Sequence, residues 1–169
     1  MRLITCLLVL SGLALNSPAL AQTSASSAEV RVLAAHGTVE VIPPDGAPVH
    51  HATAGETLGH GVRIRTASEA LVRLALPNGA TLTLLPDAGL MLFASPLRPP
   101  RGRPPSTTTA LEHGALHVTA APGEAGAFPL AVGMTTINRG RGEATVSTPR
   151  GASITRVAVY QGRVVARTG

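Results

Sequence analysis

The stretch LALPNGATLTLL, Leu74 to Leu85, places Pro77-Asn78-Gly79 between two segments that alternate leucine with alanine or threonine. A loop of Asn78-Gly79 alone would split the leucines between both faces of the hairpin, because side chains alternate along a strand. Proline favours the first central position of a type I turn, and glycine accepts the left-handed conformation that closes a bulged hairpin. We therefore predict a three-residue loop, which pairs Val72, Leu74 and Leu76 with Leu84, Leu82 and Ala80.

The same alternation of apolar and other residues continues along most of the chain. A second turn, Pro44-Asp45-Gly46, predicts a hairpin in which Val41 lies opposite Val49. The segment TASEALVRLALP, residues 66–77, begins like a helix capping box, but its period-two apolar residues and the hairpin register favour a strand. Further strands are expected in EVRVLAAHGTVEVI, GETLGHGVRIRT, LEHGALHVTA, FPLAV, EATVST and ITRVAVYQGRVVA. The predicted fold class is all-β, a compact antiparallel sandwich or roll built from hairpins.

A weak internal repeat accompanies these strands. Leu58-Gly59-His60-Gly61 followed by Thr66 recurs as Leu111-Glu112-His113-Gly114 followed by Thr119, at a spacing of 53 residues. A glycine three residues after an apolar residue is common in hairpin sequences. The repeat is therefore explained as well by chance or shared turn chemistry as by duplication.

The N-terminus predicts export. MRLITCLLVLSGLALNSPALA contains one arginine, an apolar run and a final Ala-Leu-Ala, and this pattern is typical of a cleaved signal peptide. We expect cleavage near Ala21, so residues 1–21 form the signal peptide, 22–29 a flexible lead-in, and 30–169 one β domain. The mature protein is then periplasmic or secreted and does not span the membrane. Cys6 is the only cysteine and lies in the signal, which leaves no disulfide framework.

Composition restricts the classes of partner. Removal of the signal leaves 13 arginines against 9 acidic residues, a mild positive charge that suits an acidic partner but also serves solubility. The mature chain has few aromatic residues, whereas binding of single-stranded nucleic acid normally uses stacked aromatic side chains beside a basic groove. We therefore do not expect nucleic acid as a partner.

The segment SPLRPPRGRPPSTTT, residues 95–109, predicts an exposed loop rich in arginine and proline. Prolines reduce the ordering cost of binding, and loops on rigid scaffolds often carry function. Arg98, Arg101 and Arg103 are therefore the candidate partner-binding residues. The alternative is an insertion with no binding role.

Several motifs taken together resemble one known family. They are Gly37-Thr38-Val39-Glu40-Val41, Asp45-Gly46, Gly55-x-x-Leu58-x-x-Gly61-x-x-Ile64-Arg65-Thr66, Ser68-x-Ala70, Leu74-x-Leu76-Pro77-Asn78-Gly79-Ala80-x-Leu82-x-Leu84, and Leu111-x-x-Gly114-x-Leu116-x-Val118. In this order they look like the FecR domain, the periplasmic sensor module of bacterial iron-transport regulators. The resemblance extends from about Val30 to Ala166. The segment INRGRGEATVST departs from it, because the family's later Gly-Thr and aromatic strand have no clear counterpart there.

The resemblance implies a role in contact between envelope proteins. Full-length regulators of this family usually carry a cytoplasmic anti-sigma segment and one membrane span, and they meet an outer-membrane TonB-dependent transducer. This sequence is expected to carry only the extracytoplasmic domain, which makes a transducer or membrane regulator the expected partner. A different class of function remains open, namely binding of cell-wall polysaccharide or another anionic envelope polymer through arginine.

Catalytic and metal-binding patterns are weak. His113 and His117 fall on one side of a strand but about 13 Å apart, at roughly 3.3 Å per residue, while the neighbours His50 and His51 point to opposite faces. The sequence also has no nucleophile elbow and no His-Glu-x-x-His motif. We therefore expect no enzyme activity, no metal and no cofactor.

Overall fold

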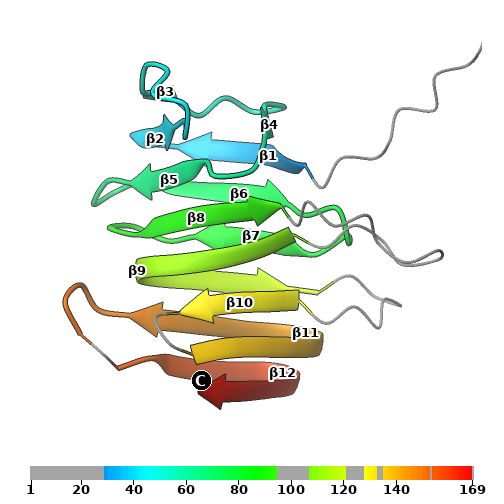
Figure 1. Cartoon of the computed structure of the whole chain (residues 1–169). Helices are drawn as coiled ribbons and strands as arrows, with labels where there is room; N and C mark the ends of the chain where they lie inside the picture. Colours follow the sequence, from blue (N-terminus) through cyan, green and yellow to red (C-terminus); the bar gives the residue numbers. More distant parts are fainter. Residues whose placement is uncertain (1–28, 95–106, 121–127, 133–134, 153, 169) are drawn as a thin grey trace, which may run out of the picture.

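The structure is a computed structural model that describes residues 29–94, 107–120, 128–132, 135–152 and 154–168. Regular secondary structure in these ranges consists of strands alone (Figure 1). The strands are β1 (Val30–His36), β2 (Val39–Ile42), β3 (His50–His51), β4 (Thr57–Leu58), β5 (Arg63–Thr66), β6 (Leu71–Ala75), β7 (Thr81–Leu84), β8 (Gly89–Ala94), β9 (Thr107–Thr119), β10 (Phe128–Val132), β11 (Thr135–Thr148) and β12 (Arg156–Thr168). The predicted all-β class is confirmed.

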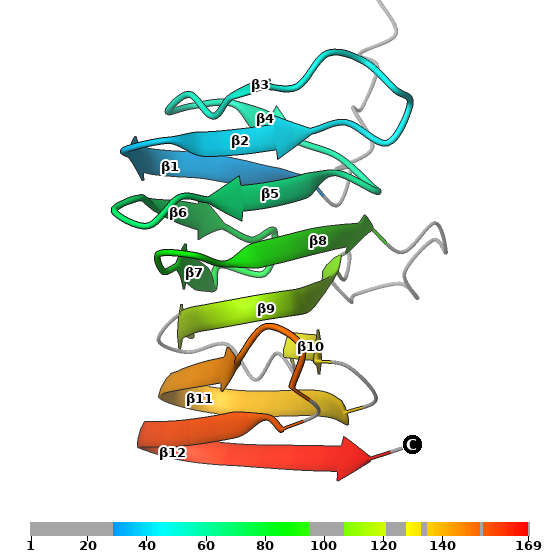
Figure 2. The ribbon, with the colours of Figure 1, turned by 90° about the vertical axis from the view of Figure 1, so that its left-hand side faces the viewer.

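The strands form one sheet that curls on itself into two facing halves (Figures 1 and 2). One half contains β3, β2, β5 and β8, and the other contains β4, β1, β6 and β7. Strand β9 belongs to both halves, because it pairs with β8 along its first part and with β7 along its second part. Among the described strands, β10 pairs with β9 in parallel, and the other pairs are antiparallel. The architecture is a half-barrel whose apolar side faces inward.

The β6–β7 hairpin has the predicted register. Val72 pairs with Leu84, and Leu74 pairs with Leu82, with all four side chains fully buried. The loop is closed by hydrogen bonds from the Gly79 amide to the Leu76 carbonyl and from the Leu76 amide to the Ala80 carbonyl, both 2.9 Å. Gly79 has a φ of 81°, as the left-handed position of a bulged hairpin requires.

The second predicted hairpin is wrong by one residue. Val41 pairs with His50 rather than with Val49, which is 54% exposed. Pro48 has no backbone N–H to donate to a ladder, so pairing starts only after it. The Asp45 carboxylate also accepts a hydrogen bond from the Ala47 amide at 3.2 Å, which forms an Asx turn within this connection.

The later strands are longer than the sequence suggested. Strand β9 begins at Thr107, inside the expected 95–109 loop, and Thr109 is fully buried. Segment 154–166 contains most of a single strand, β12, which continues through Gln161-Gly162. The two copies of the weak repeat have different settings, since Gly61 lies in the turn between β4 and β5 and Gly114 lies within β9.

Strand β9 crosses between the halves by bending at Gly114. Its φ is 90°, a region that disfavours other residues. A Cβ at this position would overlap both Cα and Cβ of Ala88. Glycine is therefore needed for backbone conformation and for the close approach of the β7–β8 connection.

The core lies between the two halves of the sheet. Its largest fully buried side chains are Ile64, Leu74, Leu82, Leu84, Leu90, Leu92, Leu111, Leu116, Leu130, Val30 and Val32. The buried polar residues of the described ranges are Thr66, Thr109 and Thr148, and Thr66 fixes the position of the end of β5. Its hydroxyl donates to the Leu85 carbonyl at 2.6 Å and accepts from the Ala88 amide at 3.0 Å, which joins the end of β5 to the β7–β8 connection.

Candidate interaction surfaces

The first candidate surface is the open end of the half-barrel at β12. This strand pairs with β11 only, so its other edge has no partner strand in the described part of the chain. Val157 lies opposite Val146, and Val159 lies opposite Ala144. Cross-strand partners share a face, so both valines point inward like their buried partners. They are nevertheless 36% and 45% exposed, because none of the described strands lies beyond them to close the core.

The opposite end of the half-barrel is protected. Strands β3 and β4 have two residues each, and prolines 43, 44 and 48 lie in the connection before β3. Short strands and prolines are devices that prevent an edge from pairing with another chain. Strand β12 has 13 residues and no proline. The two ends therefore differ in strand length and in proline content, two features that control edge pairing.

The outward face of β12 also carries exposed apolar side chains. Tyr160 is 66% exposed and Val165 is 46% exposed. The Tyr160 ring lies beside His117, with 6.1 Å between ring centroids. His117 is held by Glu143, whose Oε1 lies 2.9 Å from Nε2, and by the Thr145 hydroxyl, 3.0 Å from Nδ1. The three charged residues of the strand are all basic, Arg156, Arg163 and Arg167.

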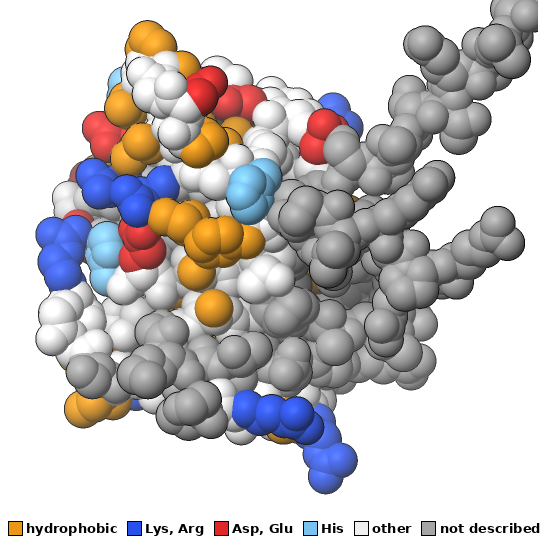
Figure 3. Space-filling model, viewed as in Figure 1, with side chains coloured by type: hydrophobic (Ala, Val, Ile, Leu, Met, Phe, Trp, Pro, Cys, Tyr) orange, Lys and Arg blue, Asp and Glu red, His pale blue; other side chains and the backbone are white. Residues whose placement is uncertain are grey.

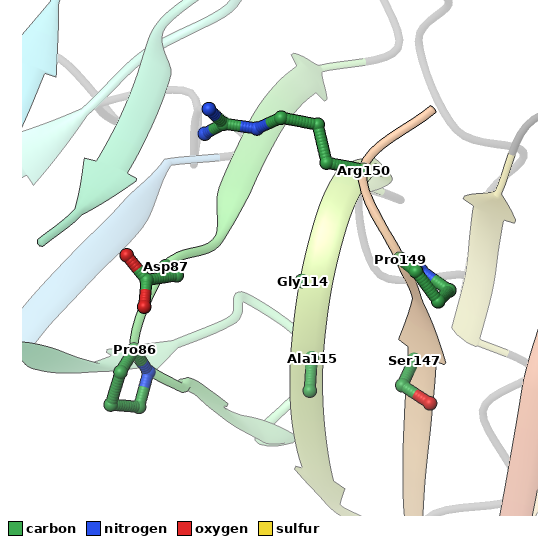
Figure 4. A pocket seen from close by; sticks show the side chains of 7 residues that line it. All are labelled: Pro86, Asp87, Gly114, Ala115, Ser147, Pro149 and Arg150. Carbon is green, nitrogen blue, oxygen red and sulfur yellow. The ribbon is translucent and has the colours of Figure 1, made fainter. Parts of the chain in front are cut away.

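The second candidate surface is the corner groove, which we define by Glu40, Arg65, Thr66, His113 and Arg150. It lies where β9 bends, and Figure 3 shows arginines gathered with a histidine and an acidic side chain at the left edge of this face. Its volume is about 190 Å³. An adjoining open pocket shares Arg150 and includes Asp87. In Figure 4 the Arg150 side chain extends past β9 toward the side on which Asp87 lies.

The charged groups of the corner are arranged by hydrogen bonds. Arg150 Nη2 lies 3.0 Å from His113 Nε2. Since a guanidinium only donates, Nε2 must accept and His113 is neutral with its proton on Nδ1. Burial and then the charge of Arg150 lower the pKa of His113 below its ordinary value, in agreement with that geometry. The neighbouring Glu112 accepts a hydrogen bond from Arg63 Nε at 2.9 Å.

A third cluster, His50 with Glu56, supports the loop at the protected end. His50 Nε2 lies 2.7 Å from Glu56 Oε1, and the Thr53 amide donates to the other carboxylate oxygen at 3.0 Å. The hydrogen bond to Glu56 raises the pKa of His50. This arrangement closes the loop between β3 and β4.

Arg98, Arg101 and Arg103 lie outside the described residues. His113 and His117 contact different partners, Arg150 and Glu143. Within the described ranges, no three His, Cys, Asp or Glu side chains come together as metal ligands. In those same ranges the structure has no helix capable of crossing a membrane.

Sequence reasoning missed both surfaces. For the corner groove, the available signal was Gly114 directly after His113 within an otherwise regular strand, which marks a bend. For the open end, the available signal was a long valine-rich strand without proline or acidic residues. No sequence signal linked Arg150 to Arg65, because they come from distant segments.

Comparison with known proteins gives no match to a family model, to a curated protein or to a solved structure.

Proposed function

We propose that this chain is an exported FecR-like β domain that acts as a protein-interaction or signal-sensing module in the bacterial envelope, without catalysis. The observation that carries the proposal is the open end of the half-barrel at β12. The resemblance to the FecR domain supports the same class of role, with a transducer or a membrane regulator as partner. The predicted signal peptide supports a periplasmic or secreted location.

The expected mode of contact is addition of a partner strand to β12. The unpaired edge offers backbone hydrogen-bond donors and acceptors along 13 residues. A strand placed there would also cover the inward valines Val157 and Val159. Full burial of a valine contributes roughly 1.5–3 kcal/mol, so covering the exposed 36% and 45% contributes about 1 kcal/mol for each.

The experiment is affinity purification of the tagged mature chain, Gln22 to Gly169, from envelope extract of the source organism. The test variant is the double substitution Val157→Thr and Val159→Thr, which keeps side-chain volume and β propensity but removes apolar surface. The matched control is Val49→Thr, because Val49 is 54% exposed at the protected end. We expect a protein partner whose affinity falls about tenfold in the double variant and is unchanged in the control.

If the recovered protein binds the double variant as tightly as the unmodified chain, the open end is not the contact. If no protein is recovered at all, the interaction role itself is contradicted.

The alternative function is binding of cell-wall polysaccharide or another anionic envelope polymer. The observation that favours it is the basic character of β12, whose exposed charges are Arg156, Arg163 and Arg167 with no acidic residue. Pelleting with purified peptidoglycan tests it across a salt series, because contacts between exposed charges weaken as salt increases. Loss of pelleting on changing Arg98, Arg101 and Arg103 to alanine would assign the contact to the arginine- and proline-rich segment.

A further inference from the structure

The corner groove is constructed by the bend of the sheet. The His113 side chain lies over Gly89 of β8, where an added Cβ would come within 2.7 Å of the imidazole Cε1. Gly89 therefore makes room for the imidazole. On the other side, the hydrogen bonds of the Thr66 hydroxyl hold the β7–β8 connection against the end of β5. The groove is thus lined by the end of β5, the β7–β8 connection and the middle of β9, which are held together by these contacts.

Two guanidinium groups at this groove lack a carboxylate partner. In the described ranges the arginine–carboxylate ion pair is that of Arg63 with Glu112, and neither Arg65 nor Arg150 forms one. The acidic residue that lines the groove is Glu40, which lies opposite Arg65 across β2 and β5. With His113 neutral, the residues that line the groove carry two positive charges and one negative charge, a net of about +1; Asp87, which lines the adjoining pocket, lies outside this count.

We propose that the corner groove binds a single small carboxylate group, held by the guanidinium groups of Arg65 and Arg150. Arginine presents paired N–H donors that match the two oxygens of a carboxylate. The net charge of about +1 fits a monoanion better than a phosphate dianion. The volume of about 190 Å³ is below the roughly 300–1,000 Å³ typical of sites for drug-sized ligands, so the ligand is a small acid or the carboxylate end of a longer chain.

His113 reports on occupancy of the site. The charged groups that act on it are Arg150, Glu112, Arg65 and Asp87, which come from the segment after β11, from β9, from β5 and from the β7–β8 connection. A bound carboxylate adds negative charge near the imidazole and offsets the two arginines. Binding therefore raises the pKa of His113, and by linkage protonation of His113 strengthens binding.

The test is an NMR titration of the full chain, in which sodium acetate replaces sodium chloride at constant ionic strength. The imidazole signals of His113 are identified by their absence in His113→Gln. We expect a saturable shift of these signals and a rise in the His113 pKa. Arg150→Gln and Arg65→Gln should each weaken acetate binding about tenfold or more, through loss of a charge-assisted hydrogen bond.

The matched control is Arg73→Gln, which removes an exposed guanidinium from β6 and leaves acetate binding unchanged. An unsaturable shift, or one that persists in both groove variants, would refute the site. Tighter binding of inorganic phosphate than of acetate would overturn the carboxylate assignment. The inference does not depend on the proposed contact at β12, because the Val157 and Val159 substitutions leave the groove intact.

Discussion

Substitution of Gly114 by alanine tests whether the bend in β9 holds the two halves together. Two effects lower the stability of this variant. A non-glycine residue in the left-handed region costs roughly 1–2 kcal/mol. The new Cβ would also overlap Cα and Cβ of Ala88, and overpacking of this kind costs typically 1–3 kcal/mol. The expected loss of unfolding free energy is therefore about 2–5 kcal/mol, a large fraction of the roughly 5–15 kcal/mol that stabilises a typical domain.

The matched control is Gly46→Ala. Gly46 also has a positive φ, 78°, but an added Cβ would meet nothing within 4 Å. This substitution retains the conformational cost and lacks the steric one, so the expected loss is about 1–2 kcal/mol. The difference between the two variants isolates the contact with Ala88.

Both variants are measured by urea unfolding, followed by far-UV circular dichroism. A difference of 1 kcal/mol corresponds to roughly 2–4 °C in Tm for a chain of this size, so thermal melts provide a second readout. Equal destabilisation of the two variants would show that Ala88 yields to the new methyl group. The reasoning about close approach at the bend would then be wrong.

Two further predictions concern the core and one ion pair. Leu82→Ala, at a fully buried position, should lower the free energy of unfolding by about 2–5 kcal/mol. Leu33→Ala, at 45% exposure, should lower it by well under half as much. Similar losses for the two variants in urea unfolding would contradict the buried face of the β6–β7 hairpin. The raised pKa of His50 contributes stability that is present below its ordinary value of 6.5 and is lost as the pH rises through the folded value. The Tm difference between the unmodified chain and His50→Gln should therefore shrink as the pH rises above 6.5, and a difference that grows instead would exclude the pairing with Glu56.

The β6–β7 hairpin was predictable because its information is local. Pro77-Asn78-Gly79 specifies a turn, and the leucine pattern then allows only one register that buries a single face. The preference for strand over helix in residues 66–77 followed from the same register. The hairpin at Pro44-Asp45-Gly46 failed by one residue because Pro48 delays pairing on a two-residue edge strand. Both residues of β3 are exposed, so no buried apolar side chains on that strand fix its register.

The candidate surfaces depend on contacts between distant segments. Arg65 and Arg150 flank one groove only because β9 bends at Gly114 and brings the end of β5 near the segment after β11. The exposure of Val157 and Val159 likewise depends on β12 being the last strand of the sheet, which alternation along the strand does not reveal. Turn chemistry and alternation act over a few residues and therefore specify hairpins and buried faces. The order of strands, their bends and the resulting grooves are decided by packing of the whole sheet, so they emerge only in the tertiary structure.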